Sequence, residues 1–213
     1  MNDVYTYLYK VEWCIIIIMK KERLLIRNGS RILTPAQHYR LREALDPNGG
    51  YRIIIDGLIN TGARVVEFWK IVKNPQWYHA SRRLIDLPSI GACKKPMCTQ
   101  TDRTIKLTER GCAALDIIYS SEIEYRDPAS MNQALKRAAK KAGFEHVEGI
   151  NSKMYRKILI SWLIECRKDL GIDSSDIQAS MGHTEDTMIA SYLGIGFDEQ
   201  EHADMLAFVK GWG

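Results

Sequence analysis

The chain has 213 residues, of which 46% are hydrophobic and 26% charged, and a formal net charge of +4 at pH 7. These values indicate an ordinary soluble globular domain with a proper core. The apolar run from Trp13 to Met19 is too short for a membrane span, which needs about 20 residues, and its flanks exclude a signal peptide. Five cysteines without paired spacing exclude a disulfide framework or zinc site and indicate reduced intracellular thiols.

The predicted elements are mostly helical. Residues 1–30 form an arm that ends at the turn-like Asn28-Gly29-Ser30, and Thr34-Pro35-Ala36-Gln37 has the pattern of a capping box that starts a helix running to about Leu45. The other predicted helices cover about 51–60, 63–72, 109–119, 128–142, 153–169, 174–181, 185–193 and 198–210. The stretches 83–87 and 103–107 read as short strands. The sequence therefore predicts a mainly α fold with one small antiparallel β-sheet.

Charge is distributed unevenly along the chain. Residues 77–110 hold seven Lys or Arg against three acids, and residues 136–157 hold seven against two. Residues 173–204 hold eight acids and neither Lys nor Arg. Two interpretations are open: these stretches are solvated helix faces, or the basic ones bind the phosphates of nucleic acid.

Three short motifs stand out together, and they resemble the three boxes of the tyrosine recombinases, the phage-integrase family. "TGARVVEFWKI", from Thr61, resembles the first arginine box, and "KMYR", from Lys153, resembles the box usually written H-x-x-R. "MGHTEDTMIASY", from Met181, resembles the third box, a Gly-His followed nine residues later by a tyrosine. The order and spacing agree over about residues 31–197, which implies the catalytic-domain fold of that family.

Each motif residue also has an ordinary structural interpretation. Arg64 could be a surface cation, Arg156 a helix-face cation with its stem on the core, and His183 a helix cap. Tyr192 could simply pack with Met188 and Ile189 as one apolar stripe. The combination in this order favours the functional interpretation over these alternatives.

The resemblance implies a site-specific recombinase or integrase that cuts and rejoins DNA through a 3′-phosphotyrosyl intermediate. Tyr192 would be the nucleophile, Arg64 and Arg156 would neutralise the phosphate with planar charged forks, and His183 would donate to a non-bridging oxygen or assist the tyrosine. The reaction needs no metal, because the arginines neutralise the phosphate, and no ATP, because a phosphotyrosyl ester keeps most of the energy of the original linkage.

Lysines complete the implied catalytic set. Lys153 stands where most family members have histidine, a departure that resembles integrases of some archaeal viruses and plasmids and the related type IB topoisomerases. Lysine is a poor general base near neutral pH, so it would instead donate a hydrogen bond to phosphate. Lys94, with Lys95 as the alternative, lies in the loop where the family carries its leaving-group acid, although an exposed basic loop touching phosphate explains both residues equally well.

The resemblance also implies partners and a division of the chain. The partner would be double-stranded DNA, and the protein would act as a homo-oligomer, a tetramer on DNA. The two basic stretches supply the residues expected to contact phosphates, Arg82, Arg83, Lys136, Lys140 and Lys157. Residues 1–30 would be an arm or remnant linker, 31–197 the catalytic domain and 198–213 a terminal helix that packs on a neighbouring subunit or, alternatively, on its own domain.

The family normally carries a further DNA-binding domain before the catalytic one, so the chain would be a catalytic fragment or a minimal recombinase. We expect a cytoplasmic, DNA-associated protein that is not bound to a membrane. Two other functions stay open. One is a topoisomerase-like nicking and closing activity, and the other is an inactive DNA-binding protein of the same fold.

Overall fold

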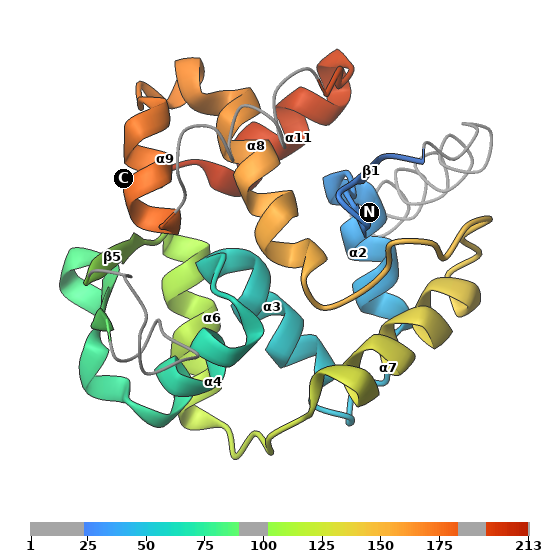
Figure 1. Ribbon diagram of the computed structural model, residues 1–213, viewed down its shortest axis with the longest axis horizontal. Helices are drawn as coiled ribbons and strands as arrows, with labels where there is room; N and C mark the ends of the chain where they lie inside the picture. Colours follow the sequence, from blue (N-terminus) through green and yellow to red (C-terminus); the bar gives the residue numbers. More distant parts are fainter. Residues whose placement is uncertain (1–23, 90–101, 183–194, 213) are drawn as a thin grey trace, which may run out of the picture.

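The computed structural model describes residues 24–89, 102–182 and 195–212, and Figure 1 shows the arrangement of their elements. The helices are α2 (Pro35–Ala44), α3 (Tyr51–Thr61), α4 (Val65–Lys73), η1 (Pro75–Trp77), η2 (Ala80–Arg82), α6 (Glu109–Ser120), α7 (Pro128–Lys141), α8 (Met154–Leu170), α9 (Ser174–Met181) and α11 (Glu199–Val209). The strands are β1 (Ile26–Arg27), β2 (Ser30–Arg31), β3 (Tyr78–His79), β4 (Leu84–Leu87) and β5 (Arg103–Lys106). The predicted fold class is confirmed.

Helix α8 lies at the centre of the core and packs against α3, α9 and α11 (Figure 1). It is buried on most of its circumference, as expected of a helix covered on several sides. Its Trp162 is fully buried and donates a hydrogen bond from Nε1 to the carbonyl of Leu33 at 3.0 Å. The N-terminal turn of α8 carries Arg156, one of the predicted site residues.

The predicted helix starts agree with the observed caps. Thr34 accepts a hydrogen bond from the backbone of Gln37, and the Gln37 side chain accepts one from the Thr34 backbone, which completes the capping box. Asp127 caps α7 in a similar way. One boundary was wrong: the helix expected from residue 63 begins at Val65, because Arg64 keeps an extended backbone at the N-cap position.

The small sheet is antiparallel, with the strand order β3-β4-β5. Ile85 pairs with Ile105 across the two strands that were predicted, and both side chains are buried. Strand β3 was not predicted, since a two-residue strand is too short to show alternation. The sheet is held to α9 by a hydrogen bond from the backbone of Lys106 to the Ser180 hydroxyl at 3.0 Å.

The described part of the N-terminal arm is a hairpin, β1–β2, that packs on the domain. Asn28 and Gly29 form its turn with positive φ angles, as two-residue hairpin turns require. The backbone of Arg31 donates to the carbonyl of Gly149 at 2.9 Å. A Cβ on Gly149 would lie 2.7 Å from the Arg31 nitrogen, so this close approach needs glycine.

The last helix, α11, packs against α8 and α2 of its own chain. Phe208 is 5% exposed, and its ring lies 4.9 Å from that of Trp162 and 6.1 Å from that of His38. The apolar face of α11 therefore completes the core around α8 of the same chain, and packing of this helix on a neighbouring subunit stays a prediction. Among the described residues, no helix is both long and apolar enough to cross a membrane.

Candidate active site

The three motif segments meet at the side chain of Arg156. Its Nη1 donates to the carbonyl of Gly62 at 2.8 Å, and its Nη2 donates to the carbonyl of Met181. Gly62 closes α3 and Met181 is the last residue of α9. Arg156 is 8% exposed. One buried guanidinium therefore joins the first motif, the second motif and the start of the third.

Packing reinforces the same junction. Gly62 has a φ of +59°, and a Cβ there would lie 2.7 Å from the Met181 sulfur and 3.0 Å from a methyl group of Leu159. Only glycine combines this left-handed turn with so close an approach. The turn between α3 and α4 is consequently pressed against α9 just before Gly182.

Arg64 lies two residues beyond Gly62, at the N-cap of α4. Its side chain is 34% exposed, and its Nη1 donates to Oε1 of Glu67 at 2.5 Å. The backbone nitrogen of Arg64 donates to Oε2 of the same carboxylate at 2.7 Å. Glu67 thus orients Arg64 by accepting hydrogen bonds from both the backbone nitrogen and the guanidinium of Arg64. The Arg64 side chain stays partly exposed to solvent.

A second arginine, Arg103, pairs with Glu67 from the start of β5. Its Nη2 lies 2.8 Å from Oε2 and its Nη1 3.2 Å from Oε1, and its side chain is 6% exposed. Burial by itself would raise the pKa of Glu67, but the hydrogen bonds and charge of Arg103, together with the charge of Arg64, lower it below its ordinary value. Sequence reasoning assigned no role to Glu67 and counted Arg103 only as part of a basic stretch; the one available signal was a carboxylate within an apolar helix.

Lys153 is exposed and directly precedes α8. The backbone of the neighbouring Ser152 donates to the Asn132 side chain on α7 at 2.7 Å. Lys136 lies four residues after Asn132 and so shares its helix face. Lys136 is exposed as well. The flank of α7 that carries Lys136 therefore faces the segment with Lys153.

The other predicted DNA-contacting residues lie in different surroundings. Arg82 is exposed on η2, whereas Arg83 is half-buried with a φ of +52° and approaches Glu109 to 4.0 Å. Lys140 is exposed on α7. Lys157 donates from Nζ to the carbonyls of the β1–β2 turn, at 3.1 and 2.8 Å. Burial, helped by the charge of Lys153, lowers the pKa of Lys157.

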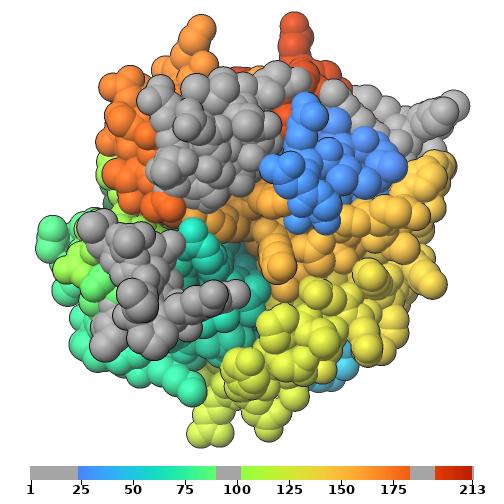
Figure 2. Space-filling model, viewed as in Figure 1, coloured from blue at the N-terminus to red at the C-terminus, as the bar shows by residue number. Residues whose placement is uncertain are grey.

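In the view of Figure 2, the surface is hollowed where α4 (teal), α7 (yellow) and the first part of α8 (light orange) come together. Lys136 lies on α7 and Arg156 on α8, and Arg64 directly precedes α4. The predicted site residues Lys94, Lys95, His183 and Tyr192 lie outside the described residues.

Tyr155, a neighbour of Arg156 in the sequence, is unsuited to be a nucleophile. It is fully buried, and burial, followed by the charge of Asp56, raises the pKa of its hydroxyl well above the ordinary value. His38 lies 6.0 Å from its ring and is itself buried. Both side chains belong to the aromatic core beneath α11.

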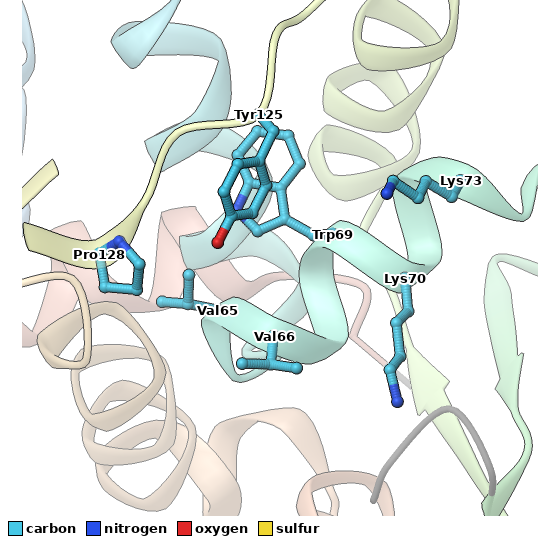
Figure 3. A pocket seen from close by; sticks show the side chains of 7 residues that line it. All are labelled: Val65, Val66, Trp69, Lys70, Lys73, Tyr125 and Pro128. Atoms are coloured by element: carbon cyan, nitrogen blue, oxygen red, sulfur yellow. The ribbon is translucent and has the colours of Figure 1, made fainter. Parts of the chain in front are cut away.

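A separate shallow pocket of about 190 Å³ lies along α4 (Figure 3). Trp69 and Tyr125 form its wall with ring centroids 5.2 Å apart, and Lys70 and Lys73 extend from the same helix as Trp69. None of the predicted catalytic residues lines it. Within the described part of the chain, no group of three or more His, Cys, Asp or Glu side chains is arranged to hold a metal ion.

Solved structures of recombinases share this fold. The crystal structure of XerA recombinase aligns with a TM-score of 0.54 at 18% identity, covering 90% of this chain and 65% of that one. The Tn1549 transposon integrase in complex with circular intermediate DNA gives 0.56 at 18%, covering 83% and 66%. The same integrase with transposon right end DNA gives 0.57 at 16%, covering 89% and 67%. The chain thus has the fold of a tyrosine recombinase catalytic domain and spans about two-thirds of the length of these structures.

The likeness is one of structure. No family model matches the sequence, and no curated protein matches it either. At identities of 16 to 18%, this structural likeness establishes the fold alone.

Proposed function

We propose that this chain cuts and rejoins double-stranded DNA as a site-specific recombinase of the tyrosine type. The observation that carries the proposal is the position of Arg156, whose guanidinium binds both Gly62, at the turn before Arg64, and Met181, two residues before His183. Three motifs distant in the sequence are thereby drawn to one cationic junction. Such a junction suits a phosphodiester, whose transition state gathers negative charge on its oxygens.

The proposed reaction begins when the hydroxyl oxygen of Tyr192 attacks the scissile phosphorus. A bond forms between that oxygen and phosphorus, the bond from phosphorus to the 5′ oxygen breaks, and the protein becomes linked to the 3′ end. Arg64 and Arg156 neutralise the non-bridging oxygens, and His183 donates to one of them or assists the tyrosine. Reversal with a different 5′ hydroxyl rejoins the strand, so no external energy source is needed.

The departing 5′ oxygen needs a proton, because an alkoxide is a poor leaving group. We assign this proton to Lys94, with Lys95 as the alternative. Lys153 precedes α8 and lies three residues before Arg156. It is therefore better placed to contact a non-bridging oxygen.

The partner in this proposal is duplex DNA, bound through the hollowed face in Figure 2. Lys136, Lys140, Arg82, Arg83 and Lys157 would contact phosphates and contribute a salt-dependent, sequence-independent part of the affinity. A tetramer on DNA would bring four sites together for exchange between two duplexes. Two of the similar structures are integrases described in complex with DNA, which is consistent with this partner.

One alternative keeps the chemistry and changes the outcome: a type IB topoisomerase-like enzyme that nicks and closes one duplex. The lysine at position 153 favours it, since the resemblance associates that residue with those topoisomerases as well as with some viral integrases. A Holliday-junction substrate separates the two, because a recombinase resolves it into duplexes while a relaxing enzyme only removes supercoils from a plasmid. An inactive DNA-binding protein would do neither.

The test is covalent capture. A library of nicked suicide duplexes with a randomised central segment is incubated with the protein and resolved on a denaturing gel. We expect a labelled protein band of reduced mobility with wild type and none with Tyr192→Phe, which should bind duplex normally. Duplex binding without any covalent band from wild type would leave only the inactive binding protein.

A further inference from the structure

Arg103 and Glu67 form a buried ion pair at the candidate site, and neither residue belongs to the predicted catalytic set. The side chain of Arg103 is 6% exposed, and that of Glu67 is 1% exposed. The pair joins β5 to α4, 36 residues apart in the sequence. An ion pair removed from water costs desolvation energy and is a poor means of stabilising a fold unless it has a further role.

The hydrogen bonds of Glu67 are fully used by two arginines. Its Oε1 accepts from Nη1 of Arg64 and Nη1 of Arg103, and its Oε2 accepts from the Arg64 backbone and Nη2 of Arg103. A carboxylate that accepts four such bonds stays ionised when buried. Glu67 therefore presents a fixed negative charge directly beneath Arg64.

Charge balance gives Arg103 its importance. Arg64 and Glu67 by themselves sum to zero, and a neutral pair would attract a phosphate weakly. With Arg103 the three groups sum to +1. Because the carboxylate and Arg103 are both buried, water screens little of this difference. Arg103 thus allows Glu67 to hold Arg64 in place without cancelling its charge.

Arg103 also touches the third motif. A Cβ on Gly182 would lie 3.1 Å from Nη1 and 3.2 Å from Cδ of Arg103, so the guanidinium lies close against the backbone of the residue before His183. Gly182 has a φ of +61°. One side chain therefore contacts the end of α9 and, through Glu67, the start of α4.

We propose that Arg103 is a positioning residue that acts through Glu67 to orient Arg64 and preserve its attraction for the scissile phosphate. The inference rests on the proposed function for the step that it accelerates. It adds a residue outside the Arg64, Arg156, His183 and Tyr192 set, and it predicts a charge relationship that a purely structural ion pair would not have.

The first experiment measures the single-turnover rate of covalent adduct formation on a suicide duplex selected from the library. Arg103→Met should lower the rate by about tenfold or more, since a charged hydrogen-bonding partner of Arg64 is left uncompensated. The double variant Arg103→Met/Glu67→Gln should recover most of that rate, because the cancelling carboxylate is gone. A double variant slower than Arg103→Met would overturn the proposal, as a structural role predicts two accumulating defects.

Thermal unfolding of each variant accompanies these rates. Should Arg103→Met fail to fold, Arg103→Lys replaces it, since lysine keeps the charge but cannot form the two-pronged contact. Arg103→Lys should then retain more activity than Arg64→Lys, because in the proposed function the guanidinium of Arg64 contacts the phosphate itself. Equal loss in these two variants would contradict a role that acts through charge.

A second measurement does not depend on cleavage. Affinity for a fixed duplex is determined for Arg103→Met in the wild-type and the Glu67→Gln backgrounds. Arg103→Met should weaken binding by about tenfold in the first, where the remaining charges of Arg64 and Glu67 sum to zero, and by under about twofold in the second, where Arg64 keeps an uncancelled charge. Lys106→Met, on the same strand but paired with Asp176 at 3.2 Å, is the control and should have the same effect in both backgrounds.

The two measurements distinguish the failures. Wild type that binds duplex but forms no adduct overturns the proposed function, while the affinity cycle still decides whether Arg103 acts through Glu67. An active wild type with equal Arg103→Met effects in both backgrounds overturns only the positioning role. Wild type that does not bind duplex at all overturns both.

Discussion

The guanidinium of Arg156 donates to the carbonyl of Gly62 at 2.8 Å across 94 residues of sequence. This contact ties the helix of the second motif to the turn of the first. Arg156 therefore fixes its own guanidinium and the turn before Arg64 in one arrangement. In the proposed reaction, this preorganisation would stabilise the charged transition state.

Replacing Arg156 should damage activity and stability together. Arg156→Lys keeps the positive charge but cannot serve Gly62 and Met181 at once. We expect a loss of about 2–3 kcal/mol in the free energy of unfolding, measured with urea, and no detectable covalent adduct. The exposed Lys153 is the control, since Lys153→Ala should leave unfolding unchanged; an Arg156→Lys protein as stable as wild type would contradict the observed contacts.

Gly62→Ala tests how tightly the first motif is pressed on α9. Gly62 and Gly143 both have positive φ, but a Cβ meets Met181 and Leu159 at Gly62 and nothing within 4 Å at Gly143. Gly143→Ala should cost about 1–2 kcal/mol from backbone strain, and Gly62→Ala about 1–3 kcal/mol more from overpacking. Urea denaturation of the two variants measures the difference, and equal losses would mean that the junction is looser than described.

His38 should make the fold sensitive to mild acid. Burial, followed by the charges of Arg42 and Arg110, lowers the pKa of His38 to about 3. The unfolded chain binds this proton at about 6.5, so the neutral histidine contributes stability above that pH, and the contribution is lost as the pH falls towards 3. His38→Phe should flatten the stability profile, recovering about 2 kcal/mol of the acid-induced loss at about pH 5. Titration of the carboxylates changes the stability of wild type and of His38→Phe equally. Parallel profiles of unfolding free energy against pH would therefore disprove the role of His38.

The flank of α7 beside the candidate site should bind phosphate. Lys136→Ala should weaken duplex binding and lower the slope of log affinity against log salt by about 0.9. Lys141, which lies about 140° around the helix from Lys136, is the matched control and should change neither quantity when replaced by alanine. Equal effects of the two substitutions would indicate that α7 contributes only diffuse charge.

Chemical rescue identifies the leaving-group acid. Lys94→Ala should not cleave ordinary DNA but should cleave a 5′-bridging phosphorothiolate, whose thiolate leaves without a proton. Arg64→Ala should fail on both substrates, since charge neutralisation is still needed. Rescue of Lys95→Ala or Lys153→Ala instead would transfer the acid role to that lysine.

Local signals in the sequence were sufficient for most of the fold. The capping box at Thr34, the Asp127-Pro128 start of α7 and the Gly182 end of α9 all lie where they were expected, because caps depend on neighbouring residues alone. The hairpin β1–β2 and strand β3 were missed, since two-residue strands form only through long-range pairing.

The candidate site was predictable only in part. Motif spacing indicated Arg64 and Arg156, but the contact of Arg156 with Met181 depends on how α8 packs on α9. The pairing of Glu67 with Arg103 could not be foreseen either, because nothing local relates a helix carboxylate to a strand 36 residues later. Lys157 also differs from expectation in its surroundings, as its amine contacts the hairpin turn.

The most direct test of the proposed function is to identify the amino acid that becomes linked to DNA. Wild-type protein is trapped on the suicide duplex, digested with trypsin and nuclease, and the nucleotidyl-peptide is sequenced by mass spectrometry. We predict a 3′-phosphotyrosyl bond on Tyr192, in a peptide that contains His183. A nucleotide attached to any other residue, or no covalent adduct from a protein that binds duplex DNA, would contradict the account.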